Sequence, residues 1–156
     1  MTVVLVTGMS GTGKSSALAE LARRGHEVVD TDHGNWIAEP PNSERLWRED
    51  RMDELLAGHQ EGVLFVSGCV ANQGRFYPRF DAVVLLSAPT EVILERVAKR
   101  GTNDFGKTDA ERARILSDLA TVEPLLRRGA TAEIDTRAPI DEVVDALERI
   151  ALATTP

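Results

Sequence analysis

The chain has 156 residues, a formal net charge of −7 at pH 7, and 42% hydrophobic and 28% charged residues. This length accommodates one domain with a single core, so we expect one domain over residues 1–156, and no apolar stretch reaches the roughly 20 residues of a membrane-spanning helix. The acidic charge disfavours a general role with nucleic acids, because most of the surface would repel a phosphate backbone.

Two features of the sequence indicate the compartment. Residues 1–8 carry no basic residue before their apolar run, so they do not resemble a signal peptide. Cys69 is the only cysteine, which excludes an internal disulfide and a multi-cysteine zinc site and fits a reducing compartment. We therefore expect a soluble, cytoplasmic protein with no membrane partner. The oligomeric state stays open.

Short apolar runs alternate with helical patterns along the chain. The β-branched and apolar run 2–7 predicts a buried strand that ends at a glycine, and the spacing of apolar residues predicts a helix over 14–24. Further strands are expected at 27–30, 62–67, 81–87 and 132–135, and further helices at 43–57, 90–100, 109–128 and 139–151. Pro124 is expected to bend or interrupt its helix. This alternation predicts an α/β fold, with a parallel sheet covered by helices on both faces.

Residues 8–15 read Gly-Met-Ser-Gly-Thr-Gly-Lys-Ser and match the eight-position phosphate-binding loop, or P-loop, in full. They lie between a predicted strand and a predicted helix, which is the context that this motif requires. The alternative is a chance glycine-rich turn. In a P-loop, backbone N–H groups surround the phosphates, Lys14 reaches the outer phosphates and Ser15 can coordinate Mg²⁺. The residues expected to contact the nucleotide here are Gly8, Met9, Ser10, Gly11, Thr12, Gly13, Lys14, Ser15 and Ser16.

Two carboxylates follow directly on the second predicted strand. Asp30 and Asp32 should project from the carboxyl end of the sheet, where ligands of open α/β folds bind. We expect Asp30 to hold Mg²⁺ through water and Asp32 to orient and deprotonate an attacking hydroxyl group. The alternative is a solvated turn or a helix cap, since Asp favours both.

Basic residues in this acidic chain are candidates for anion contacts. Arg96 and Arg100 lie four residues apart on one predicted helix, just before the polar loop 101–107, and can stabilise a transferring phosphoryl group. Solvated helix charges are the alternative. Other arginines could reach the same crevice, although none is specific alone: Arg48, Arg51, Arg75 and Arg79. Trp47 is either a wall of the substrate site or a core residue.

Together these residues resemble the P-loop kinases of the nucleoside-monophosphate-kinase-like group, and most closely its shikimate kinase and gluconate kinase branch. The resemblance spans nearly the whole chain. It implies a three-layer sandwich around a roughly five-stranded parallel sheet of order 2-3-1-4-5, an acceptor-binding segment at 31–60 and a small lid at 100–110. It also implies ATP and Mg²⁺, with the adenine held between Arg96 and the loop that contains Arg137 and Pro139.

The acceptor side departs from the family. The stretch 43–48 is similar to a Gly-Glu-x-x-Phe-Arg stretch whose Arg binds the shikimate carboxylate, so Arg48 would be its counterpart. Shikimate kinases carry three glycines after the third strand and a second carboxylate-binding Arg, where this chain has Ser67-Gly68-Cys69 and Val122. The loss of one carboxylate clamp argues against shikimate as the acceptor. The residues expected to contact the acceptor are Asp32, Arg48, Gly68, Cys69, Asn72 and Arg75.

The leading hypothesis is phosphoryl transfer from ATP, with Mg²⁺, to a hydroxyl group of a small anionic or sugar-like metabolite. Lys14 and Arg100 would neutralise the moving phosphoryl group, and Asp32 would act on the hydroxyl. The same scaffold could also serve a nucleoside or nucleotide kinase or an antibiotic phosphotransferase. A third alternative is a nucleotide-binding regulator with little turnover.

Overall fold

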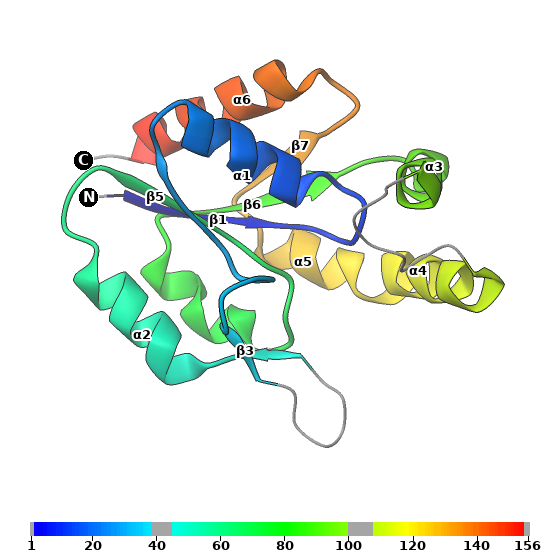
Figure 1. Cartoon of the computed structure of the whole chain (residues 1–156), viewed down its shortest axis with the longest axis horizontal. Coiled ribbons are helices and arrows are strands. Elements are labelled where there is room, and N and C mark those ends of the chain that lie inside the picture. The colour runs from blue at the N-terminus through cyan, green and yellow to red at the C-terminus, as the bar shows by residue number, and fades with distance from the viewer. Residues whose placement is uncertain (1, 39–44, 100–107, 155–156) are drawn as a thin grey trace.

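A parallel sheet of five strands forms the centre of the computed structural model, which describes residues 2–38, 45–99 and 108–154 (Figure 1). Its strands are β1 (Thr2–Thr7), β2 (Glu27–Asp30), β5 (Val63–Ser67), β6 (Ala82–Ser87) and β7 (Ala132–Asp135). The spatial order is β2-β5-β1-β6-β7, and every pairing is parallel. Counted along the chain, this is the predicted order 2-3-1-4-5.

Helices cover both faces of the sheet because its central strands are apolar on both sides. All six residues of β1 are buried, and successive side chains point to opposite faces. Val4 and Val6 pack with α1 (Lys14–Arg23) and α6 (Ile140–Thr154), whereas Val3 and Leu5 pack with α2 (Glu49–Gly58) and the 3₁₀ helix η1 (Gln73–Arg79). The result is the predicted three-layer sandwich.

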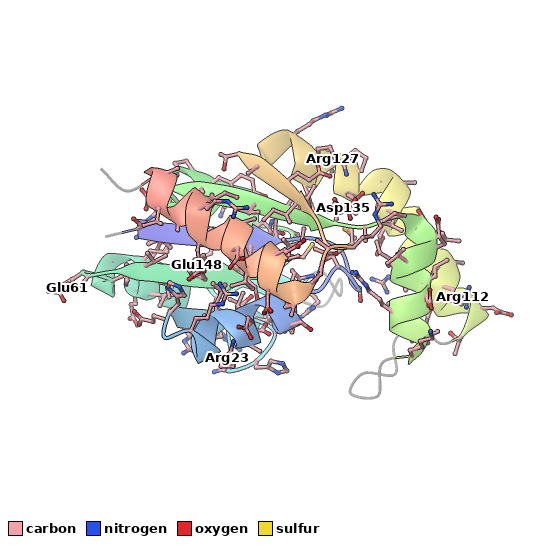
Figure 2. The ribbon with its side chains drawn as sticks, turned by 90° about the horizontal axis from the view of Figure 1, so that it is seen from above. Arg23, Glu61, Arg112, Arg127, Asp135 and Glu148 are labelled. Atoms are coloured by element: carbon pink, nitrogen blue, oxygen red, sulfur yellow. The ribbon has the colours of Figure 1, made fainter. Side chains whose placement is uncertain are left out.

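Charged side chains join the two helices of the first face. Arg24, directly after α1, pairs with Glu20 of α1 and with Asp145 and Glu148 of α6. His26 lies 2.7 Å from the second carboxylate oxygen of Glu148, which Figure 2 shows on α6 above the sheet. These contacts connect the two helices across the outside of the sandwich.

The helical stretch around Pro124 divides as predicted. α4 (Asp109–Thr121) is capped by Val122, and Pro124 lies in the first turn of α5 (Glu123–Gly129). In that turn a backbone N–H has no partner within the helix, so the N–H that proline lacks is not needed. Ile93 and Val97 of α3 (Thr90–Lys99) pack on Ile115 of α4. α3 and α4 thereby lie together beyond one end of the sheet (Figure 1).

The prediction for 43–57 was wrong at its start. The helix begins at Glu49, and Leu46–Trp47 form a short strand, β4, that pairs antiparallel with β3 (Ile37–Ala38). The cause is tertiary: the amide of Asn72 bonds both the backbone N–H and the backbone carbonyl of Trp47. The 3₁₀ helix η1 was also not predicted.

The expected lid at 100–110 lies mostly outside the described residues, which resume at Thr108, the N-cap of α4. In the three described ranges, no helix has the length and apolar character needed to cross a membrane.

Candidate active site

The P-loop joins the carboxyl end of β1 to the first turn of α1. Gly11 and Gly13 have φ angles of 84° and 94°, a region that residues with a side chain rarely adopt. The buried Thr12 stabilises the turn, because its hydroxyl donates to the carbonyl of Met9 at 2.7 Å. Lys14 Nζ donates to the carbonyl oxygen of Gly8 at 2.6 Å. The loop therefore presents backbone N–H groups, a helix N-terminus and an ammonium group at one point, a combination that binds phosphate.

A hydroxyl group and a carboxylate meet beside this loop. Ser15 Oγ donates to Asp30 Oδ2 at 2.9 Å, and the backbone N–H of Asp32 donates to Asp30 Oδ1 at 3.1 Å. Oxygen ligands of this kind suit Mg²⁺, which usually takes one or two protein ligands and completes its shell with water and phosphate oxygens. Among the described residues, no three His, Cys, Asp or Glu side chains gather into a metal cage. The residues present fit a magnesium ion bound together with a nucleotide.

Asp32 has a cationic neighbour that the sequence did not predict as a site residue. Arg45 NH2 lies 3.4 Å from Asp32 Oδ1, and both side chains are partly exposed. The only signal in the sequence was the position of Arg45 three residues before Arg48, inside the stretch that resembles the acceptor-binding motif.

The two carboxylates are held by the residue between them. Thr31 is fully buried, and both its N–H and its hydroxyl donate to the carbonyl of Ser67 on β5. The indole N–H of Trp47 donates to Thr31 Oγ1 at 2.9 Å. Trp47 is 1% exposed, so of its two interpretations the core residue is the one observed. Sequence reasoning missed Thr31 because its partners lie 16 and 36 residues away.

A small cavity of about 230 Å³ lies at the other side of the P-loop. It is lined by Gly13, Ser16, Arg96, Thr136, Ala138, Ile140 and Val143. The guanidinium group of Arg96 donates to the carbonyl and hydroxyl oxygens of Thr136 at 2.6 and 2.8 Å, and to the carbonyl of Gly11 at 3.4 Å. Arg96 therefore connects the P-loop with the loop after β7.

The other predicted nucleotide contacts have separate positions. Arg137 turns back to Asp135, and this guanidinium holds the pKa of the Asp135 carboxyl below its usual value. Pro139 does not line the small cavity, although its neighbour Ala138 does. Arg100, predicted to act on the phosphoryl group, lies outside the described residues.

The pKa of Cys69 depends on several groups near the P-loop. The thiol is half-buried, and burial raises its pKa above the usual value. The carboxylates of Asp32 and Asp118 also raise this pKa, whereas Lys14 and a hydrogen bond with Thr7 lower it. Gly68 precedes it, with no room for a side chain beside Thr31 and Trp47. Thr7 of β1, Lys14 of α1, Asp118 of α4 and Asp32, two residues after β2, thus all act on the pKa of this thiol.

Arg48, which is predicted to contact the acceptor, lies on the surface. Its backbone N–H donates to the carbonyl of Trp36, and its exposed side chain has no hydrogen-bond or ion-pair partner within the described ranges. The neighbouring Arg51 is engaged differently, since its guanidinium donates to the carbonyls of Gly34 and Asn35 and stacks over Trp36.

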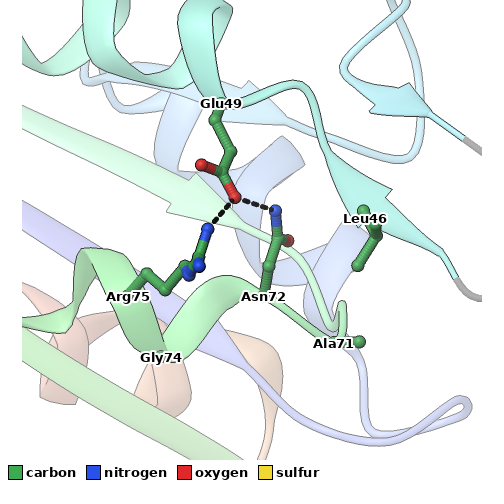
Figure 3. Close-up of a pocket in the computed structure, with 6 residues that line it drawn as sticks. All are labelled: Leu46, Glu49, Ala71, Asn72, Gly74 and Arg75. Carbon is green, nitrogen blue, oxygen red and sulfur yellow. Dashed lines mark hydrogen bonds and ion pairs between the residues drawn. The ribbon is translucent and has the colours of Figure 1, made fainter.

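Asn72 and Arg75 line a larger, open groove of about 510 Å³ (Figure 3). Its other lining residues are Leu46, Glu49, Ala71 and Gly74. Glu49 Oε2 accepts hydrogen bonds from Asn72 Nδ2 at 3.1 Å and Arg75 NH1 at 2.8 Å, as Figure 3 shows. None of these lining residues belongs to the P-loop, so the larger volume of this groove does not make it the site of the reaction. Contact of Asn72 and Arg75 with the acceptor stays a prediction.

Comparison with known proteins agrees with this geometry. A family model described as AAA domain matches residues 4–117. Among curated proteins, no significant sequence relative was found. A shikimate kinase from Acinetobacter baumannii, solved in complex with shikimate, has a TM-score of 0.73 and 20% identity over 99% of this chain and 95% of that chain.

Two further solved structures share the architecture. A shikimate kinase from Bacteroides thetaiotaomicron has a TM-score of 0.65 and 19% identity, covering 96% of this chain and 97% of that chain. A sugar kinase from Janibacter sp. has a TM-score of 0.57 and 21% identity, covering 100% and 99%. At such identities the likeness concerns the fold, and it confirms the predicted group. The chain belongs to the AAA domain family and has the fold of the shikimate-kinase-like P-loop proteins.

Proposed function

We propose that this chain transfers a phosphoryl group from ATP, with Mg²⁺, to a hydroxyl group of a small metabolite. The observation that carries the proposal is the contact of Ser15 Oγ with Asp30 Oδ2, at 2.9 Å, beside a P-loop that ends in Lys14. A phosphate site alone would serve any nucleotide-binding protein. Ser15 and Asp30 can together hold Mg²⁺ at this point, and the carboxylate of Asp32 follows two residues further, so the groups needed for transfer are close to one another.

Each residue has a distinct part in this proposal. The P-loop N–H groups and Lys14 bind the phosphates and neutralise charge as the phosphoryl group moves. Ser15 and Asp30 hold Mg²⁺, which offsets charge on the outer phosphates when bound. Asp32 orients the acceptor hydroxyl and accepts its proton. The predicted role of Arg100 is to stabilise the same phosphoryl group.

The small cavity beside Arg96 supports the placing of the nucleobase. Its lining includes Gly13 and Ser16, at the start of α1, so a nucleotide whose phosphates lie in the P-loop could extend its base there. Arg96 forms one wall, and Ala138, between Arg137 and Pro139, forms another. The wall residues are partly apolar, as a site for a flat aromatic base requires.

The acceptor we propose is not shikimate, although a structural relative was solved in complex with it. Val122, which stands where the family resemblance implies a second carboxylate-binding Arg, packs on the apolar cluster of Met9, Leu85 and Leu126. Arg48 remains available for an anionic group of another acceptor.

The test is an acceptor screen by thermal shift, with Mg²⁺ and a non-hydrolysable ATP analogue present, because a bound ligand raises the unfolding temperature by mass action. Compounds that raise it are then incubated with ATP, and the product is identified by mass spectrometry. The control is the variant Lys14→Met. If the native chain binds ATP but forms ADP no faster than this variant with any acceptor, the kinase proposal fails, and a nucleotide-binding regulator accounts better for the site.

A further inference from the structure

The buried side chain of Gln73 joins two loops of the candidate site. Gln73 is the first residue of η1 and is 2% exposed. Its oxygen Oε1 accepts a hydrogen bond from the backbone N–H of Val70 at 2.9 Å. Its nitrogen Nε2 donates to Thr7 Oγ1 at 3.0 Å and to the hydroxyl oxygen of Tyr77 at 2.9 Å. Both polar atoms of this amide therefore have partners.

Two of these partners belong to opposite sides of the proposed reaction. Thr7 is the last residue of β1 and directly precedes the P-loop. Val70 ends the segment 68–70, which follows β5. We call this segment the acceptor loop, because its first two residues are predicted to contact the acceptor. Gln73 thus connects the start of the phosphate-binding loop with the end of the acceptor loop.

A buried amide with all its partners in place favours one arrangement of the groups that it joins. If either loop moved, a polar atom would be left in the interior without a hydrogen bond, which is costly. The strands beneath are already joined, because the N–H of Gly68 donates to the carbonyl of Val6 at 3.2 Å. Gln73 extends this connection past the ends of the strands.

Phosphoryl transfer is sensitive to the distance between these loops. In the proposed function, the P-loop binds the phosphates and the acceptor lies against the acceptor loop. The reacting atoms must approach in line to about 3–3.5 Å, and a misplacement of about 1 Å can lower the rate by about 10²-fold. A side chain that sets this distance can therefore affect the reaction without touching either substrate.

We propose that Gln73 is a positioning residue for phosphoryl transfer, which holds the acceptor loop at a set distance from the P-loop. This inference rests on the proposed function, because it concerns the geometry of the same site. Loss of the Gln73 amide should lower the rate of transfer and leave the binding of the nucleotide intact, because the P-loop itself is unchanged.

Gln73→Met tests the proposal, because methionine has a similar length but bonds neither Val70 nor Thr7. With the acceptor that the thermal-shift screen identifies, kcat should fall by about 10- to 100-fold. The Kd of the ATP analogue with Mg²⁺ should be unchanged. Hydrolysis of ATP without an acceptor should also be unchanged, since attack by water does not depend on the acceptor loop.

The partners of Gln73 supply matched variants. Thr7→Val removes the hydroxyl group at the P-loop end of the connection and should lower kcat as much as Gln73→Met does. The double variant should be no slower than either single variant, because both changes break the same connection. Tyr77→Phe removes the third hydrogen bond of the same amide and keeps the ring, so kcat should stay at the native value. Thermal unfolding compares the stability of all four variants.

Exchange of the Val70 amide hydrogen, followed by NMR, tests the connection without an acceptor. It should be about 2- to 10-fold faster in Gln73→Met, as expected for the loss of one hydrogen bond, and unchanged in Tyr77→Phe.

A kcat that Gln73→Met leaves unchanged overturns the proposal, and so does a fall in kcat that Tyr77→Phe shares or that a loss of nucleotide affinity accompanies. An unchanged exchange rate at Val70 in Gln73→Met overturns it as well. A native chain that binds ATP but phosphorylates no acceptor is a separate failure, which removes the proposed function and this inference together.

Discussion

Trp47 donates its indole N–H to Thr31 Oγ1 at 2.9 Å, and this one contact joins the acceptor-binding segment to the strand end that carries Asp30 and Asp32. Thr31 is also bound to Ser67, so the carboxylates project from a backbone that is held on both sides. An edge contact with Phe76 and a tilted contact with Phe80 hold the indole of Trp47 in turn. The position of Asp30, which we propose holds Mg²⁺ together with Ser15, thus depends on the packing of the core beneath it.

Trp47→Phe should separate this hydrogen bond from burial of the ring. The variant keeps most of the apolar contact, and the lost hydrogen bond should lower the free energy of unfolding by about 1 kcal/mol. We also expect more Mg²⁺ to be needed for half-maximal binding of the nucleotide analogue, because Asp30 is held less firmly. Urea unfolding and a Mg²⁺ titration measure the two effects. Trp36→Phe, at a half-exposed ring, is the control, and an unchanged Mg²⁺ midpoint in Trp47→Phe would mean that Thr31 does not position Asp30.

Gly68→Ala should disturb the same contact from the other side. A Cβ atom at Gly68 would lie 2.5 Å from Thr31 Oγ1 and 3.1 Å from the Trp47 ring. Both neighbours are buried, so we expect a loss of about 1–3 kcal/mol in the free energy of unfolding. At Gly74 a Cβ atom meets nothing within 4 Å, which makes Gly74→Ala the matched control. Equal unfolding midpoints for the two variants would contradict this account.

Asp32→Asn should reduce turnover without weakening the nucleotide complex. The amide keeps the shape of the side chain but accepts a proton poorly, and loss of a general base lowers kcat by about 10²–10⁴-fold. Calorimetric binding of the ATP analogue with Mg²⁺ should be unchanged, because Ser15 and Asp30 remain. Asp53→Asn, which removes an exposed partner of Arg79, is the control. A fall in nucleotide affinity comparable to the fall in kcat would instead assign Asp32 to the metal.

The contact between α1 and α6 predicts a loss of stability in acid. The hydrogen bond with His26 lowers the pKa of Glu148 most, burial opposes it, and Arg24 lowers it further. Because the folded-state pKa is below the unfolded value, the contribution is complete above about pH 4.3 and is lost as the pH falls through the folded-state pKa. Urea midpoints measured over this range should therefore decrease more steeply for the native chain than for Glu148→Gln. Equal slopes would show that Glu148 is not a source of the acid sensitivity.

The sequence by itself determined the features that adjacent residues encode. The P-loop is eight consecutive residues, and β1 and α1 flank it with their own periodicity, so the phosphate site and the parallel sheet could be predicted before any contact was known. Pro124 likewise ends one helix and begins another through local geometry.

Only the tertiary structure decided which distant side chains meet. Local pattern predicted a helix from residue 43, but the amide of Asn72, 25 residues further along the chain, holds Trp47 in a strand instead. Arg45 beside Asp32 became apparent for the same reason. Pairing and desolvation depend on neighbours in space, and no spacing along the chain specifies them.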